Sequence, residues 1–226
     1  MRYIKKYSIF ESVTDDQFFK TYNETQYWLN DMRIYNYTIN SNLTVDVDDN
    51  INLYGRDLNF FPIQFGNIKG SFCCKRNNLR SLKGCPLSMD INKEFNCCNN
   101  WLTDLKYAPE CKVIDCEYNF LETLEGCPKI VERLNIGNNK IKSLNGISEN
   151  LNSIYYHRNP IEDILDIVHE KNLYKFIKYL NEYDVINKNI LFLDKLKDAL
   201  YMIDKNLNDI NKFIYDSLNK NYNVIE

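Results

Sequence analysis

The chain has 226 residues, of which 44% are hydrophobic and 14% aromatic, and its formal net charge at pH 7 is −3. This composition is typical of a folded protein of one or two domains. The acidic balance, without a cluster of Lys and Arg, predicts no nucleic-acid partner. The longest apolar run is too short to span a membrane, and acidic residues follow the first charged ones, so we expect neither membrane insertion nor export by the secretory route.

Residues 1–42 are expected to form a helical N-terminal cap. Thr14 and Gln17 have the spacing of a capping box, which predicts a helix that ends near Met32. The candidate core contacts of this helix are Phe18, Phe19, Tyr22 and Trp28. A cap is expected because the repeat array that follows would otherwise expose an apolar edge.

A repeated asparagine is the main feature of the middle of the chain, where it recurs at spacings of 23, 19, 20 and 20 residues. The five positions are Asn77, Asn100, Asn119, Asn139 and Asn159. The first full unit reads Phe72-x-Cys74-x-x-Asn77-x-Leu79-x-x-Leu82, and an imperfect earlier copy reads Ile51-x-Leu53-x-x-Arg56-x-Leu58. A regular period over five units indicates a solenoid of stacked repeats.

Each repeat predicts one short strand and a tight turn, with alternate apolar side chains pointing into a shared core. The asparagine amide has an acceptor and two donors, so it can satisfy backbone groups where the chain leaves the strand. Val45 and Val47 predict an additional edge strand. The predicted solenoid covers residues 43–165, and its six strands, at a spacing of about 4.8 Å, give a sheet only about 25 Å wide.

The repeat register also interprets the cysteines. It gives Cys74, Cys97 and Cys116 the inward position, and it places Cys85 and Cys127 in matching turns, so we interpret all five as small core residues. Alternation points Cys73 and Cys98 outward, as exposed thiols suited to a reducing compartment. No C-x-x-C pair is present, which favours the core interpretation over zinc, and the reducing compartment makes disulfides the weaker alternative.

The turns after the strands carry a second motif, in which glycine permits positive φ and proline fixes the exit. The two clearest copies read Leu82-Lys83-Gly84-Cys85-Pro86 and Leu124-Glu125-Gly126-Cys127-Pro128. Together with the asparagine pattern, these turns resemble the leucine-rich repeat family, and in particular leucine-rich repeat proteins encoded by tailed bacteriophages. The resemblance covers roughly residues 28–186. It implies a viral protein in the cytoplasm of a bacterial host, with no catalytic residues to carry over. We expect neither a metal site nor a cofactor.

Residues 166–226 are predicted to form a helical C-terminal subdomain, which makes the expected fold class α+β. Apolar residues recur at helical spacing over 164–167, 173–180, 193–203 and 210–218. We expect these helices to cap the solenoid. The alternative is that the last two helices form a dimer or partner groove, so that the chain is a monomer or a homodimer and acts as a structural or assembly protein.

Alternation leaves a row of varied, mostly polar side chains on the outward face of the predicted strands. We predict a noncatalytic module that binds a partner through this face, and the resemblance makes that partner a host protein, for example a defence or regulatory factor. The candidate contacts are Tyr54, Asp115, Glu117, Arg133, Asn135, Tyr155 and His157. Tyrosine and arginine are common interface anchors.

Three chemical alternatives are weaker. Asp115 and Glu117 could act as paired carboxylates, but outward acids on one strand are more often a solvated patch. Cys98 and His157 would lie three coils apart, about 14 Å, which is too far for a nucleophile and its base. An acidic cluster at residues 46–49 could hold calcium, but it lacks the repeated Gly-Asp turns of calcium-binding β-solenoids.

Overall fold

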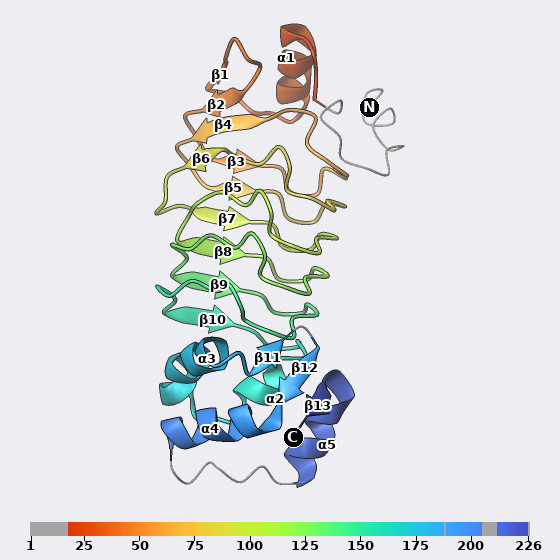
Figure 1. Ribbon diagram of the computed structural model, residues 1–226. Helices are drawn as coiled ribbons and strands as arrows, with labels where there is room; N and C mark the ends of the chain where they lie inside the picture. The colour runs from red at the N-terminus through yellow and green to blue at the C-terminus, as the bar shows by residue number, and fades with distance from the viewer. Residues whose placement is uncertain (1–17, 188, 205–211, 226) are drawn as a thin grey trace.

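The computed structural model describes residues 18–187, 189–204 and 212–225 and has a mixed α+β fold. Its coils stack along one axis, so the molecule is elongated, with α1 (Tyr22–Asp31) at one end and the helices of the tail at the other (Figure 1). Among the described residues, no helix combines the length and the apolar character that crossing a bilayer requires.

The stacked coils form a six-stranded parallel sheet, as the repeat pattern predicts. In the order along the chain, its strands are β3 (Ile51–Asn52), β5 (Phe72–Cys73), β7 (Glu94–Asn96), β8 (Val113–Asp115), β9 (Arg133–Asn135) and β10 (Ser153–Tyr155). Equivalent residues of successive repeats are paired, so that Phe72 lies opposite Phe95 and Phe95 opposite Ile114. The side chains of these three residues point into the core and are almost fully buried.

A second sheet, which the sequence analysis did not predict, lines the first coils. Its strands are β1 (Tyr37–Ile39), β2 (Val45–Val47), β4 (Phe65–Ile68) and β6 (Ser88–Met89), in the order β1-β2-β4-β6. The assignment of Val45 and Val47 to the edge of the main sheet is therefore wrong, and the expectation of one strand per coil fails for the first three coils. The asparagine spacing falls from 23 to 19 residues after Asn100, which leaves too little chain for a second strand in later coils.

Helix α1 begins later than the predicted capping box, whose residues Thr14 and Gln17 lie outside the described residues. Its N-cap is Thr21, whose hydroxyl accepts a hydrogen bond from the Glu24 backbone N–H (3.3 Å) and donates one to the Glu24 carboxylate (2.7 Å). Trp28 is buried against Phe65, with ring centroids 6.2 Å apart, as expected of a core contact. Tyr22, by contrast, is 51% exposed, so its prediction as a core residue is wrong.

Strand β1 lies inside residues 1–42, so this segment, which we predicted to be a helical cap, contains a strand as well as a helix. β1 pairs antiparallel with β2, which continues into the parallel part of the second sheet. The second sheet therefore begins in the segment that we assigned to the cap.

The tail contains the predicted helices and a small sheet that the sequence did not indicate. The elements are α2 (Glu162–Leu165), the 3-10 helix η3 (Glu170–Asn172), α3 (Leu173–Glu182), β11 (Ile186–Asn187), β12 (Ile190–Phe192), α4 (Leu193–Ile203), α5 (Lys212–Asn221) and β13 (Asn223–Ile225). Ile210 and the side chains of residues 213 and 214, predicted as part of the last apolar stripe, lie outside the described residues. The tail is tied to the coils by Tyr222, whose hydroxyl donates to the Lys142 carbonyl.

Candidate interaction surfaces

The asparagine ladder fixes the geometry of the platform. In the coil of Asn100, the side-chain oxygen accepts from the Leu79 N–H (3.0 Å), and the amide nitrogen donates to the carbonyls of Cys74 (3.0 Å) and Cys97 (3.1 Å). The other four asparagines make the equivalent bonds to their own coil and to the preceding one. Each buried amide satisfies backbone groups where the chain leaves the strand, as the sequence pattern predicted, and it also joins two coils.

A second row of polar side chains, on the outward face, is held by its own backbone. The side-chain oxygens of Asn96, Asp115 and Asn135 each accept a hydrogen bond from the backbone N–H two residues later, at 3.1–3.3 Å. Asn96 also donates to Asp115 across the strands (3.1 Å), and Asn135 donates to Glu117 (3.4 Å). This local bonding fixes the direction of each side chain.

The two predicted acids on β8 and just after it are partly buried. Burial is the largest effect on Asp115 and raises the pKa of its carboxyl, and the nearby charges of Glu117 and Glu94 raise it further. Glu117 also accepts from Asn138 (3.0 Å). Both carboxylates are therefore occupied by hydrogen bonds within the face.

The structure brings together Tyr155 and His157, whose ring centroids lie 5.1 Å apart. Tyr155 is 46% exposed, and its ring lies against Gly137 of the neighbouring coil. Arg133 is exposed at the start of β9, one strand away. These three residues and Asn135 form one end of the predicted face.

Tyr54 lies at the opposite end of the sheet, just after β3, and does not join this group. Its hydroxyl accepts from the Arg76 guanidinium (2.7 Å), and the Lys75 ammonium lies 5.6 Å from the ring centroid. Strands β5 and β7 lie between β3 and β8, so three strand spacings, about 14 Å, separate the two. The predicted contacts therefore fall into two groups, with Tyr54 apart from the other six.

Cys98 is buried, so its prediction as an exposed outward thiol is wrong. Its position in the repeat is flanked by the longer side chains of Lys75 and Glu117 in the adjacent coils, and a small side chain between two long ones is covered. Burial raises the pKa of the Cys98 thiol to about 11, so the thiol is protonated at neutral pH. Cys73 is partly buried, and the five cysteines predicted as core residues are buried free thiols.

His157 belongs to a polar cluster at the junction with the tail. Its Nδ1 lies 2.8 Å from Glu162 Oε1, and the other Glu162 oxygen accepts from the Arg158 N–H (2.6 Å). Asp166 completes the cluster and accepts from the Tyr156 hydroxyl (2.9 Å). A histidine and two carboxylates within 4.8 Å of one another are ligand types that suit a divalent cation, but each already has a partner here. We interpret the cluster as the contact that fixes α2 to the last coil.

Sequence reasoning missed an exposed aromatic cluster, which consists of Trp101, Tyr118 and Phe120. Their side chains are 45–46% exposed, although all three are large and apolar. They line an open cleft of about 500 Å³ with Asn138 and Arg158. The sequence did contain a sign of this cluster, because Trp101 and Phe120 each directly follow an asparagine of the ladder. Side chains at that position point outward.

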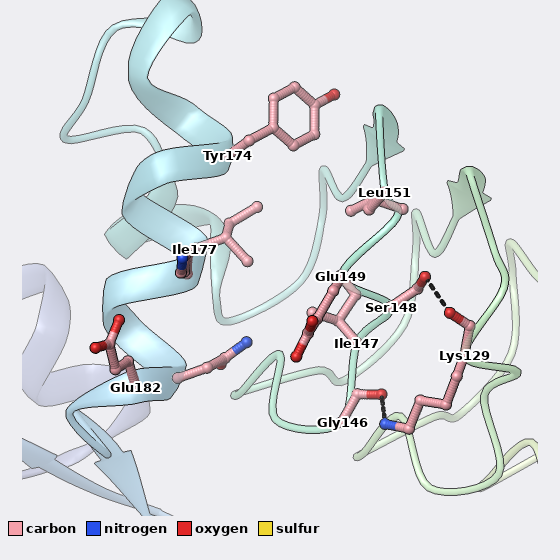
Figure 2. Close-up of a pocket in the computed structure, with 11 residues that line it drawn as sticks. Lys129, Gly146, Ile147, Ser148, Glu149, Leu151, Tyr174, Ile177 and Glu182 are labelled. Atoms are coloured by element: carbon pink, nitrogen blue, oxygen red, sulfur yellow. Dashed lines mark hydrogen bonds between the residues drawn. The ribbon is translucent and has the colours of Figure 1, made fainter.

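A groove of about 750 Å³ separates α3 from the loop that follows the fourth asparagine (Figure 2). Tyr174, Ile177 and Glu182 on α3 form one wall, and Ile147 and Leu151 belong to the loop that forms the other. The loop is held on its far side, where the Lys129 ammonium donates to the Gly146 carbonyl (2.6 Å) and the Ser148 hydroxyl donates to the Lys129 carbonyl (2.6 Å). The groove has mixed polar and apolar walls and offers no cluster of reactive groups.

Comparisons with protein-family models, with curated proteins and with solved structures gave no match to this chain. The residues and surfaces of the chain itself are therefore the basis for inferring its function.

Proposed function

We propose that the chain is a noncatalytic protein–protein interaction module that holds a partner against the outward face of the six-stranded sheet. The observation that carries the proposal is the backbone bonding of Asn96, Asp115 and Asn135, which fixes a row of polar side chains before any partner arrives. Side chains that are already ordered lose less conformational entropy on binding, which favours affinity.

The anchors of this face are Arg133 and Tyr155. Both are exposed, and within the described residues Arg133 has no ion-pair or hydrogen-bond partner for its side chain. Tyrosine and arginine supply much of the binding energy in known interfaces because they combine large contact area with directed polar groups. An exposed, unengaged arginine one strand from an exposed tyrosine is therefore a suitable anchor pair.

The polar groups on the face support a noncatalytic role. Asp115 and Glu117 are engaged with backbone or asparagine donors. The Cys98 thiol, buried and with its pKa raised to about 11, is a poor nucleophile at neutral pH.

The proposal extends to kinship and location. We assign the coils to short leucine-rich repeats of the bacteriophage type, with caps formed by the N-terminal segment and the tail, and we place the chain in the cytoplasm of a bacterial host, bound to a host protein. The repeated asparagines and Gly-Cys-Pro turns support the kinship. The burial of Trp28 against Phe65 at one end, and of Ile164 and Leu165 at the other, supports the caps.

Affinity capture from infected and uninfected bacterial lysates, read by mass spectrometry, tests the proposal. We expect one host protein to be captured by the wild type and lost with the double variant Arg133→Ala/Tyr155→Ala. The matched control is Lys106→Ala/Glu125→Ala, which removes an exposed ion pair on another side of the coils. Equal capture by all three proteins, with equal melting temperatures, would show that the strand face is not the contact surface.

A second candidate function is self-assembly through the tail, and one surface favours it. Tyr183, Tyr201 and Met202 are 46–48% exposed and border a cleft of about 300 Å³ beside α4. Large apolar side chains that gather on one surface often mark a protein contact. Light scattering would distinguish the two functions: a homodimer that Met202→Glu converts to a monomer supports assembly, and a wild-type monomer at micromolar concentration argues against it.

A further inference from the structure

We infer that the aromatic cluster of Trp101, Tyr118 and Phe120 binds an acidic segment of the partner protein, and that this segment inserts an aromatic or large apolar side chain into the cleft. The inference rests on the proposed function, because it assumes a protein partner, and adds the chemistry by which that partner is recognised. The cluster lies on the turns that follow β7 and β8, at the edge of the strand face.

The stacking of the coils places the aromatic residues in register. The Trp101 N–H donates to the Leu79 carbonyl (2.9 Å), and the Phe120 N–H makes the equivalent bond to Leu102 one coil later (2.9 Å). Trp101 and Phe120 therefore occupy the same position in adjacent coils, about 4.8 Å apart along the stack. Tyr118 and Arg158 line the same cleft, which is open enough to receive a side chain.

Cations surround this cluster. The Arg80 guanidinium lies 5.0 Å from the Trp101 ring centroid, and the Lys140 ammonium lies 5.0 Å from the Phe120 ring centroid. Arg158 donates to the neutral side chain of Asn138 (3.3 Å). Within the described part of the chain, none of these three cations forms an ion pair with a carboxylate.

Three other lysines on the coils are each neutralised by a carboxylate, unlike the three cations of the cluster. Lys69 pairs with Asp48 (2.9 Å), Lys106 with Glu125 (3.1 Å) and Lys112 with Glu132 (2.9 Å). No carboxylate is among the residues that line the cleft. Among the described residues, the nearest acids are Glu117, which accepts from Asn138 (3.0 Å), and Glu162, which accepts from the Arg158 backbone N–H (2.6 Å), and neither forms an ion pair with Arg80 or Lys140. The unneutralised positive charge beside exposed rings is complementary to an acidic segment with an apolar side chain.

An acidic peptide fits these observations better than a nucleic acid. The adjoining strand face carries Glu94, Asp115 and Glu117, and the whole chain has a net charge of −3, so a long polyanion would be repelled beyond the cluster. A short acidic segment can meet Arg80 and Lys140 over the two rings without extending onto those acids.

Trp101 itself provides the readout. The chain has two tryptophans, and Trp28 is buried at 7% exposure whereas Trp101 is 46% exposed. The purified full chain is titrated with a short peptide of Glu and Asp residues around one central Phe, and Trp emission and peptide anisotropy are followed. Control ligands are the same peptide with Lys in place of the acids, the same peptide with Gly in place of Phe, and single-stranded oligothymidylate.

We expect saturable binding of the acidic peptide with a change in Trp101 emission, weakened about tenfold by Arg80→Glu/Lys140→Glu. Trp101→Ala should reduce anisotropy-detected binding with only a small change in melting temperature, because about half of the side chain is exposed. The matched control, Lys69→Glu/Lys106→Glu, changes the charge equally away from the cluster and should leave affinity unchanged. Absence of saturable binding, equal binding of the Lys peptide, or tighter binding of the oligonucleotide overturns the inference.

The same variants separate this inference from the proposed function. Host-protein capture that survives Trp101→Ala and Arg80→Glu/Lys140→Glu, but is lost with Arg133→Ala/Tyr155→Ala, overturns the aromatic cluster and leaves the strand face as the contact. If Arg133→Ala/Tyr155→Ala changes neither peptide binding nor host-protein capture, the aromatic cluster is supported as the binding site. The strand face is then excluded as the contact surface.

Discussion

The ring of Tyr155 lies against Gly137 in the neighbouring coil, so closely that a Cβ atom on Gly137 would come within 2.5 Å of the tyrosine Cε1. Gly137 holds the outward position that Glu117 and His157 occupy in the adjacent coils. The absence of a side chain there leaves the space into which the Tyr155 ring folds. The direction of the proposed anchor is therefore set by a glycine on another strand.

Gly137→Ala should displace the Tyr155 ring without unfolding the coil. The backbone at Gly137 is outside the left-handed region, and the clashing atoms belong to a side chain that is 46% exposed and can rotate away. We expect the free energy of unfolding to change by less than about 1 kcal/mol and capture of the partner to weaken. Denaturant unfolding measures the change in stability, and the capture assay measures the change in binding. Unchanged capture would show that partner binding does not depend on the position of the Tyr155 ring.

Asn119→Ala should destabilise the chain by about 2–4 kcal/mol, because it leaves the Leu102 N–H and the carbonyls of Cys97 and Cys116 without their partner in the core. The matched control is Asn78→Ala. Asn78 is half-buried next to a ladder position, and within the described residues its side chain has no hydrogen bond. Urea unfolding of both variants gives the comparison, and equal losses would refute the role of the ladder.

Two glycines with similar backbones should respond differently to alanine. Gly126 and Gly146 have φ of 83° and 88°, but a Cβ atom on Gly126 would lie 2.4 Å from the Lys106 backbone nitrogen, whereas one on Gly146 would have 3.8 Å of clearance. Gly146→Ala should therefore lower the free energy of unfolding by only about 1 kcal/mol, the cost of placing a residue with a Cβ atom in the left-handed region. Gly126→Ala adds a clash with backbone that cannot rotate away, so we expect a clearly larger loss in thermal melts.

Asp115→Asn should raise the melting temperature at pH 7. Folding raises the pKa of this carboxyl, chiefly through burial, so stability falls as the pH rises from the unfolded value of 3.8 through the folded one. Asparagine occupies the same position at Asn96 and Asn135 and keeps the bond to the backbone, while the bond that Asn96 donates to the second carboxylate oxygen is lost, which limits the gain. Because the site is half-buried, we expect the free energy of unfolding to rise by less than about 1 kcal/mol and the melting temperature to rise by about 2 °C.

That gain should disappear below pH 3.8, where the wild-type carboxyl is protonated in both states. Asn135→Asp is the reverse control, since it adds a carboxylate beside Glu117 and should lower the melting temperature at pH 7. Melting curves that differ equally at pH 7 and at pH 3 would contradict the electrostatic explanation.

Tyr222→Phe should loosen the tail from the coils. The Tyr222 hydroxyl donates to the Lys142 carbonyl (2.8 Å) across 80 residues of chain, and burial raises the pKa of the phenol. Loss of this bond should cost about 1–2 kcal/mol, because the ring still fills its site while the carbonyl loses its partner. Faster hydrogen exchange in β13 and α5, with unchanged protection in β7 and β8, is the expected result.

The main sheet was predictable because the repeat fixes both the inward residues and the turn. The second sheet was not, because Phe65-Gly66-Asn67-Ile68 contains a glycine in the middle of a strand, which weakens any strand pattern, and β6 has only two residues. The burial of Cys98 depends on the lengths of Lys75 and Glu117 in other coils, which alternation within one strand cannot reveal.

The predicted contact residues lie on one continuous surface only in part. Strand alternation identified Asp115, Arg133 and Tyr155, which the structure places on adjacent strands. It treated Tyr54 as equivalent, although the coil order places that residue at the other end of the sheet. Trp101 and Phe120 were missed because the alternating strand pattern ends before the turn in which they lie. Their side chains form a continuous surface only when the turns of successive coils are stacked.

The asparagine ladder bonds each coil only to itself and to the coil before it. A length change by one whole coil would therefore preserve the bonding at every remaining junction, while a change by part of a coil would break it. Duplication or loss of units of about 20 residues is thus a tolerated route by which such a protein could lengthen or shorten its contact surface during evolution.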